Sequence, residues 1–172
     1  MTLPTRTPLA LALLFALTLA ACDTAGLGTG PGSSDLAVAF DWSDRIQIIE
    51  DCEFGSSNTG DFRFTVEVLA EIDGRTSRET VLDRDFAANT GTSVGVADEP
   101  TTFSVPSGAD ATFTVSFYAV ERDAISSDDL GITDTVEHTV SGGRLSPTGT
   151  QRITLSDGST CRVELAYSAS MR

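Results

Sequence analysis

A two-residue alternation of apolar and polar side chains constrains this fold more than any other feature of the sequence. In the segment FRFTVEVLAEI, residues 62–72, an apolar side chain occupies every even-numbered position, and Arg63, Thr65 and Glu67 fall between them. Successive side chains of a β-strand point to opposite faces of a sheet, so this pattern predicts a strand with one buried face. Further strands are expected at residues 36–42, 45–50, 80–86, 101–105, 111–120, 135–140, 152–155 and 161–167.

Together these segments predict an all-β domain. Short strands that recur with turn residues between them are typical of β-sandwiches. The last two are separated by SDGS, residues 156–159, a hairpin signal because glycine accepts positive φ without steric cost. We therefore expect a single antiparallel β-sandwich of roughly eight or nine strands over residues 36–172, after a signal peptide and a flexible linker.

The N-terminal segment has the features of an export signal. Arg6 precedes an uncharged run, residues 8–21, which is shorter than the about 20 residues that span a bilayer. Its length and the small residues at its end are typical of a secretory signal peptide. The sequence LAAC, residues 19–22, resembles the lipobox of bacterial lipoproteins. The resemblance implies that residues 1–21 are removed and that Cys22 carries a diacylglycerol; an ordinary signal peptide followed by a stray cysteine is the alternative.

Residues 22–35 would connect the lipid to the domain. They consist mostly of Gly, Ser, Thr and Ala, a composition that behaves as a flexible tether. Two or more acyl chains hold a protein stably on a bilayer, so the expected location is a bacterial cell envelope, with the membrane as a partner through the lipid anchor. Asp23 resembles the inner-membrane retention signal of enteric bacteria, but the choice between inner and outer membrane stays open.

The charge of the chain excludes one class of partner. It carries 25 acidic and 11 basic residues, for a formal charge of −14. Such a charge repels nucleic acid and anionic lipid headgroups. We therefore expect no nucleic-acid partner.

The two remaining cysteines are expected to form a disulfide. With Cys22 assigned to lipid, Cys52 and Cys161 would lie in an exported domain, where disulfides persist. Cys52 shares the parity of Ile48, and Cys161 shares that of Val163, so both side chains should point inward. We predict a Cys52–Cys161 bridge across the sandwich.

Acidic residues gather in two predicted loops, EDCEFGSSNTGD at residues 50–61 and ERDAISSDD at residues 121–129. Oxygen ligands on loops suit calcium, which accepts six to eight of them in loose geometry. Glu121 and Asp123 continue the parity of the preceding strand, and Asp129 follows six residues later. The alternative is that these acids are ordinary turn residues, since Asp and Ser favour turns for their own hydrogen-bonding reasons.

The acidic spacing of the second loop resembles the third calcium loop of the C-two domain, a calcium-binding β-sandwich. As in that family, an Ala-Val pair precedes the acids and an apolar residue with glycine follows them. The first loop resembles the family's first calcium loop, with an acidic residue, a glycine-rich turn and an aspartate before an aromatic strand. The resemblance implies a calcium site formed by Asp51, Asp61, Glu121, Asp123 and Asp129, with Asp128 or backbone carbonyls filling the remaining positions.

Catalytic motifs are sparse. The sequence contains no H-E-x-x-H and no P-loop, and the predicted disulfide leaves no thiol nucleophile. The single histidine, His138, lies in a predicted strand and is expected at the surface or at an edge. We therefore expect a non-catalytic binding or structural module with an unidentified protein or glycan ligand. A carbohydrate-binding or hydrolytic lipoprotein is the alternative, with Trp42 as the one tryptophan able to stack on a sugar.

Overall fold

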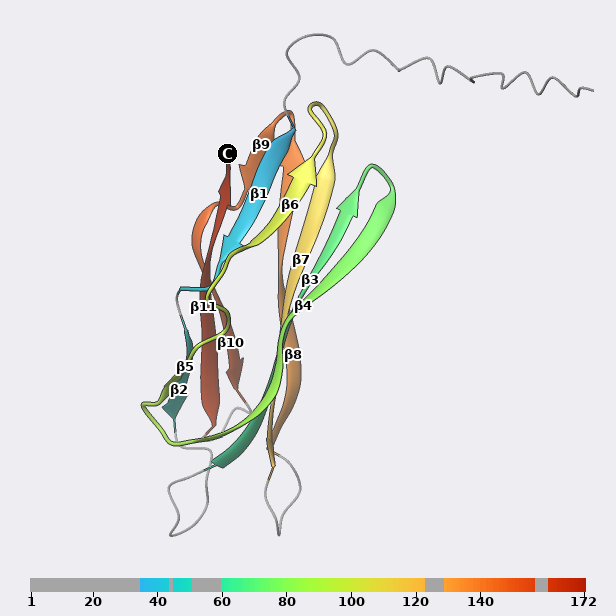
Figure 1. Ribbon diagram of the computed structural model, residues 1–172. Coiled ribbons are helices and arrows are strands. Elements are labelled where there is room, and N and C mark those ends of the chain that lie inside the picture. Colours follow the sequence, from blue (N-terminus) through green and yellow to red (C-terminus); the bar gives the residue numbers. More distant parts are fainter. Residues whose placement is uncertain (1–34, 44, 51–59, 123–128, 157–160) are drawn as a thin grey trace, which may run out of the picture. The chain divides into compact units, whose positions relative to one another are not determined.

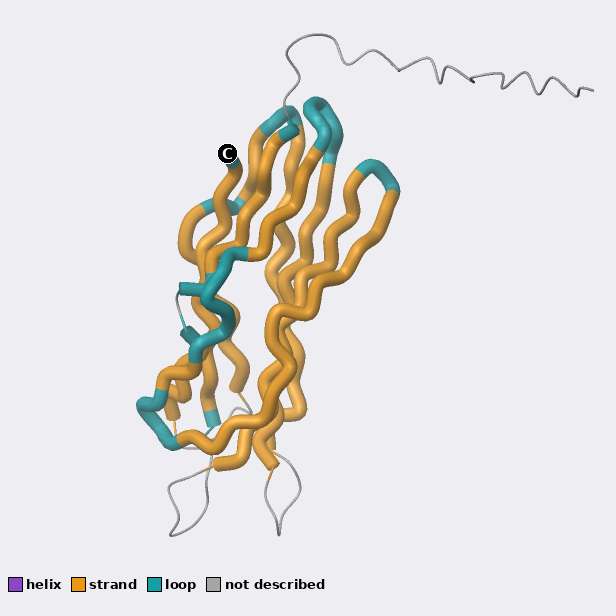
Figure 2. Tube along the Cα trace, viewed as in Figure 1, coloured by secondary structure: helices purple, strands orange, loops and turns teal. Residues whose placement is uncertain are grey.

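The structure, a computed structural model, describes residues 35–43, 45–50, 60–122, 129–156 and 161–172. These residues form eleven β-strands and no helix, arranged as two antiparallel sheets that pack face to face (Figures 1 and 2). The predicted all-β sandwich is confirmed. The strands are β1 (Leu36–Asp41), β2 (Ile46–Glu50), β3 (Gly60–Ile72), β4 (Arg75–Ala88), β5 (Ser93–Val94), β6 (Thr101–Val105), β7 (Ala111–Arg122), β8 (Asp129–Ser141), β9 (Arg144–Ser146), β10 (Gly149–Ser156) and β11 (Arg162–Met171).

The first sheet is organised around β11. One side of β11 pairs with β10, which confirms the hairpin predicted from the sequence. Its other side pairs with β2 at residues 162–165 and with β1 at residues 168–171, so these two short strands follow one another along a single neighbour. Strands β6 and β5 complete the sheet beside β1 and β2.

The second sheet has the order β4-β3-β7-β8-β9. Strand β3 pairs with β4 and β7 along almost its whole length. The turn from β3 to β4 consists of Asp73 and Gly74, whose φ angles of 50° and 72° are those of a two-residue hairpin turn. The part of the chain that the structure describes contains no helix long and apolar enough to cross a membrane.

The core lies between the two sheets and follows the alternation of the sequence. Phe64 and Val66 of β3 and Phe117 of β7 are fully buried, whereas the residues between them are partly exposed. Aromatic rings connect the layers: the ring centroids of Phe40 in β1 and Phe113 in β7 lie 5.7 Å apart. The apolar positions predicted from period two therefore form one continuous core.

Some strands differ in number and extent from those predicted from the sequence. Strands β5 and β9, of two and three residues, are too short to show an alternation, which explains why eleven strands are found. Strand β4 was expected at residues 80–86 but begins at Arg75. Residues 75–80 are exposed on both faces, so they have no apolar periodicity. Strand β8, expected at residues 135–140, likewise extends back to Asp129.

Candidate functional site

Three of the predicted calcium ligands occupy adjacent positions at one end of the second sheet. Asp61, near the start of β3, stands opposite Arg122, the last residue of β7. Glu121 of β7 stands opposite Phe62 of β3 on one side and opposite Asp129 of β8 on the other. The strand pairing therefore brings Asp61, Glu121 and Asp129 together in the backbone register at this end of the sheet.

The side chains of Asp61 and Glu121 point to opposite faces of that sheet. Phe62 is buried, with 2% of its surface exposed, and Asp61 beside it is exposed on the outer face. Glu121, opposite Phe62, is fully buried on the inner face. A cation bound by Glu121 on the inner face would therefore lie on the other side of the sheet from the Asp61 carboxylate.

Glu121 lies against the start of β3. A Cβ atom added to Gly60 would lie 3.3 Å from Oε1 of Glu121 and 2.7 Å from Cε2 of Phe62, so a larger residue would force the Phe62 ring to move. Burial of a carboxylate is costly unless hydrogen bonds or an opposite charge compensate it. Glu121 is thus the acidic group at this end whose setting differs most from that of an ordinary turn residue.

The remaining predicted ligands, Asp51, Asp123 and Asp128, lie outside the described residues. Within the described ranges, no three histidine, cysteine, aspartate or glutamate side chains are grouped so that they could hold a metal ion. The structure thus brings two predicted ligands, Glu121 and Asp129, opposite each other.

The strands that lead to the two cysteines are neighbours in one sheet. Cys161 is buried, with 1% of its surface exposed, directly before β11. Glu50, at the end of β2, pairs with Arg162 of β11. Cys52 follows Glu50 by two residues and lies outside the described range. A Cys52–Cys161 bridge would therefore join segments that adjoin two neighbouring strands of the first sheet, and the bridge itself stays a prediction.

His138 is a core residue, and its expected place at the surface or at an edge is wrong. The imidazole is fully buried in β8. Its Nδ1 lies 2.8 Å from the carbonyl oxygen of Pro147, and its Nε2 lies 2.8 Å from the hydroxyl oxygen of Tyr167 in β11. The carbonyl can only accept, so Nδ1 carries the proton and Nε2 accepts from Tyr167. The shared parity of His138 with Val136 and Val140 is the sequence signal that could have placed it inward.

Burial sets the protonation of this pair. Desolvation lowers the pKa of His138, and the hydrogen bond to the Pro147 carbonyl opposes that shift only in part. Desolvation also raises the pKa of Tyr167. Both side chains are therefore neutral near pH 7 and connect the two sheets through a neutral hydrogen bond.

The segment GTSVG, residues 91–95, matches the G-x-S-x-G pattern of serine hydrolases. In those enzymes the serine sits on a turn from a strand to a helix. Here Ser93 lies in the two-residue strand β5, and the described part of the chain contains no helix. Both ring nitrogens of His138 are hydrogen-bonded in the core, so this histidine does not reach Ser93 as a base.

Trp42 is buried as well, with 2% of its surface exposed. Its indole Nε1 donates to Oγ1 of Thr101 at 3.0 Å, and its ring lies against that of Tyr167. The tryptophan considered as a platform for a sugar is therefore part of the core.

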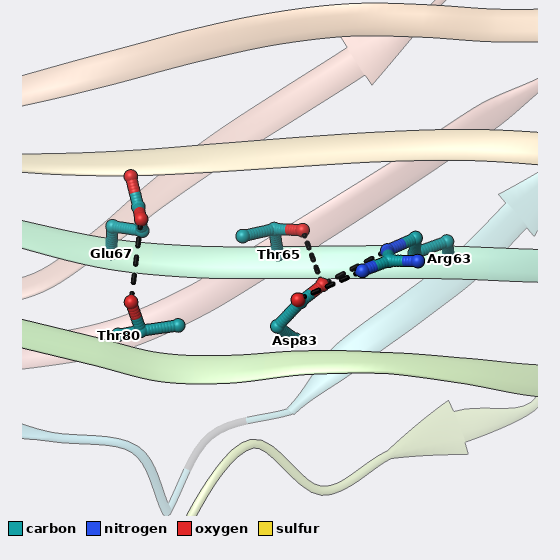
Figure 3. A network of polar contacts seen from close by, with 5 residues as sticks. All are labelled: Arg63, Thr65, Glu67, Thr80 and Asp83. Carbon is teal, nitrogen blue, oxygen red and sulfur yellow. Dashed lines mark hydrogen bonds and ion pairs between the residues drawn. The ribbon is translucent and has the colours of Figure 1, made fainter.

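The outer face of β3 and β4 carries a network of polar contacts (Figure 3). Arg63 donates two hydrogen bonds to Asp83, at 2.9 and 2.8 Å, and Thr65 donates to the same carboxylate. Farther along, Thr80 donates to Glu67. The bond from Arg63 holds the pKa of the Asp83 carboxyl below its usual range. These groups are exposed, so solvent screens their attraction.

Comparisons with known proteins identify no family for this chain. No protein-family model matches the sequence, and no curated protein matches it significantly.

Proposed function

We propose that this chain is an exported lipoprotein, held on a bacterial membrane by a lipid on Cys22, whose β-sandwich is a non-catalytic binding or structural module. The observation that carries the proposal is the order of segments in the sequence. An uncharged run ends in LAAC at residues 19–22, a Gly/Ser-rich stretch follows, and the first strand begins only at Leu36. That spacing supports a lipid anchor, a tether and a domain displayed in solution.

We further propose that calcium stabilises the domain at the end where β3 begins and β7 ends. Support comes from Glu121, a buried carboxylate whose backbone partner is Asp129, with Asp123 in the loop between them. Oxygen ligands of this kind suit calcium. The proposed ligands are Glu121, Asp123 and Asp129, with Asp51 and Asp128 from the loops; Asp61 is the weakest member because it faces the outer side.

The alternative is a carbohydrate-binding or hydrolytic lipoprotein. The burial of Trp42 favours a protein ligand or a structural role, because the one tryptophan of the chain is not available to stack on a sugar. Binding on a glycan array or turnover of a polysaccharide by the exported chain would establish the alternative.

Replacing Cys22 by alanine should abolish lipidation. Cells that express the chain are grown with labelled palmitate, and the label on the purified protein is measured. We expect label on the parent chain and none on Cys22→Ala, because the proposed lipid is attached to that sulfur. Cys52→Ala is the control that should keep its label. Equal labelling of the parent chain and Cys22→Ala would contradict the proposal.

Calcium should raise the melting temperature of the domain. If calcium binds only the folded state, a concentration 100 times the dissociation constant adds about 2.7 kcal/mol to the free energy of unfolding. Magnesium should act more weakly, because it requires stricter octahedral geometry and dehydrates reluctantly. The measurement is differential scanning calorimetry with calcium, with magnesium and with a chelator.

Asp123→Asn should reduce the calcium response, since it removes one proposed ligand. The matched control is Asp110→Asn, an exposed aspartate directly before β7, which should leave the response unchanged. Identical melting of chelated and calcium-loaded samples, with no heat of binding, would show that these acids are ordinary turn residues.

A further inference from the structure

The outer edge of β4 is the longest strand edge of the second sheet without a neighbour among the described strands. Strand β4 is 14 residues long, stands last in the order of its sheet and pairs there only with β3. Such an edge presents a row of backbone N–H and C=O groups to any other strand. Charged side chains usually prevent that pairing, because charges of the same sign meet or a charge meets an apolar side chain. Which strand this edge accepts therefore depends on the charges of its partner.

Three charged side chains lie on the outer face of β4: Arg78, Asp83, which Arg63 already binds, and Asp85. Arg78 stands opposite Leu69, and Asp85 stands opposite Arg63. Leu69 and Arg63 belong to the partly exposed set of β3, so Arg78 and Asp85 share the outer face. Arg78 already lies 3.5 Å from Glu67, with 63% of its own side chain exposed.

Three charged side chains lie on the inner face of the same strand: Arg75 at its start, Glu79 and Arg84. Glu79 stands opposite Val68, and Arg84 stands opposite Phe64. Val68 and Phe64 are fully buried, whereas Glu79 and Arg84 are exposed at the margin of the sandwich. The Arg84 guanidinium lies over the ring of Phe86, 4.6 Å from its centroid.

A bulge in β4 places the two charged residues of each pair on the same face of the strand. The register between β3 and β4 shifts at Val66, which pairs with Leu82, while the next residue, Glu67, pairs with Thr80. Val81 is therefore an extra residue, and the parity of the faces reverses across it. Residues 78 and 85 consequently share one face, and residues 79 and 84 share the other, although each pair is an odd number of residues apart.

We propose that β4 pairs antiparallel with β4 of a second copy of this chain, about a two-fold axis, with residue 75 opposite residue 88. This register uses the whole strand. Arg78 then stands opposite Asp85 of the second copy and Glu79 opposite Arg84 of the second copy, and the symmetry repeats both pairs. A two-fold axis pairs residues of the same face, so the neighbouring symmetric registers differ from this one by two residues. One of them pairs only Arg78 with Asp83 of the second copy, and the other places no two charged residues opposite each other. The proposed register has more pairs of opposite charge than either neighbour, which favours it.

A groove beside the edge fits the incoming arginine. It has a volume of about 420 Å³, lies between β4 and the segment that leads into β6, and is lined in part by Glu79, Val81, Glu99 and Phe103. In the proposed register, Arg84 of the second copy lies next to Glu79, at a groove that Glu99 also lines. A guanidinium has five N–H donors, so it can contact both while it stays stacked on an aromatic ring.

Sedimentation equilibrium of the full chain carrying Cys22→Ser tests the proposal. This substitution removes the proposed lipid site and changes no described residue. The acidic variant Arg78→Glu/Arg84→Glu and the basic variant Glu79→Arg/Asp85→Arg each place like charges opposite one another. At about 0.15 M salt, where long-range repulsion is screened, the unaltered β4 should dimerise. Each variant alone should associate at least about 100-fold more weakly than the parent, because opposed like charges disfavour an interface.

A mixture of the acidic and basic variants should restore dimers, because every charged pair across the axis is then opposite in sign. The control Arg45→Glu/Arg144→Glu changes the formal charge by the same amount as the acidic variant, at exposed positions outside β4, and should dimerise like the parent. A parent chain that stays monomeric at all concentrations, or an acidic variant that dimerises as well as the parent, would overturn the proposal.

Hydrogen exchange of the parent chain gives a test that needs no variant at β4. The backbone amides of residues 75–88 should exchange more slowly as the concentration rises through the dimerisation range, whereas those of β10, an edge of the other sheet, should not change. Protection of β10 with no change in β4 would assign the contact to a different edge and reject the β4 pairing.

Discussion

Tyr167→Ala is expected to lower the free energy of unfolding by about 3 to 5 kcal/mol, the range found when a fully buried aromatic ring is removed. The side chain of Tyr167 is fully buried in β11. Its ring centroid lies 6.2 Å from that of Phe40, 5.4 Å from that of Trp42 and 5.8 Å from that of His138. The substitution would leave a cavity between the two sheets, where rigid strands on both sides cannot close it. Urea unfolding of the two proteins measures the difference.

The chain supplies a matched control in its other tyrosine. Tyr118 lies on the outer face of β7 and is partly exposed. Because its ring already contacts solvent, Tyr118→Ala should cost clearly less than Tyr167→Ala. Equal losses for the two variants would show that Tyr167 is not the centre of the aromatic core.

Tyr167→Phe separates the contribution of the hydroxyl group to stability from that of the ring. It keeps the packing but leaves Nε2 of His138 buried without its donor, which should cost about 1 to 3 kcal/mol. A smaller loss than that would mean that water replaces the tyrosine hydroxyl.

The buried histidine also predicts how stability depends on pH. Because the pKa of His138 is lower in the folded state than its unfolded value near 6.5, the unfolded state binds a proton first as the pH falls. Stability should therefore fall below about pH 6.5, by up to about 1.4 kcal/mol per pH unit until the folded pKa is reached. His138→Gln should remove this dependence between pH 5 and 7, relative to the parent chain. The pKa of Tyr167 is raised, so a second loss of stability is expected above pH 10, and Tyr167→Phe should lack it.

The sequence predicted the core well because period two is a direct consequence of strand geometry. The alternation around Phe64 and Val66 allows one register only, since a slip of one residue would expose the whole apolar set. The start of β4 was missed because Arg75 and its neighbours are exposed on both faces. The Asp73-Gly74 pair was nevertheless a readable hairpin signal.

The candidate site was harder to predict, because the alternation of a strand does not give the direction of a side chain in a loop. The sequence predicts a loop at residues 50–61, which includes Asp61. The structure places it inside β3, one position before the buried Phe62, so its carboxylate points outward. Glu121 was placed correctly by parity with Phe117 and Ala119. His138 shows the limit of residue type as a guide: its polar ring suggested the surface, but its position in the alternation placed it inside.

The pairing of β2 with β11 bears on the predicted disulfide. Cys52 follows Glu50 by two residues and Cys161 precedes Arg162, while Glu50 and Arg162 are paired across the two strands. Two residues of extended chain span about 7 Å, and bonded cysteines have Cα atoms about 4.4 to 6.8 Å apart. The strand register therefore leaves both cysteines within reach of each other without requiring contact from sheet to sheet.

Removing the predicted disulfide should destabilise the domain strongly. The bridge would close a loop on the order of 100 residues, for which the chain-entropy model gives about 4.7 kcal/mol, an upper figure because unfolded chains retain structure. Cys52→Ala/Cys161→Ala avoids a free thiol in the core, where Cys161 is 1% exposed. Urea unfolding without reductant should show the loss. Reductant should lower the stability of the parent chain toward that of the double variant and leave the double variant unchanged. Alkylation of both thiols in native protein from an oxidising compartment, together with equal stability of the two proteins, would show that the cysteines are not paired.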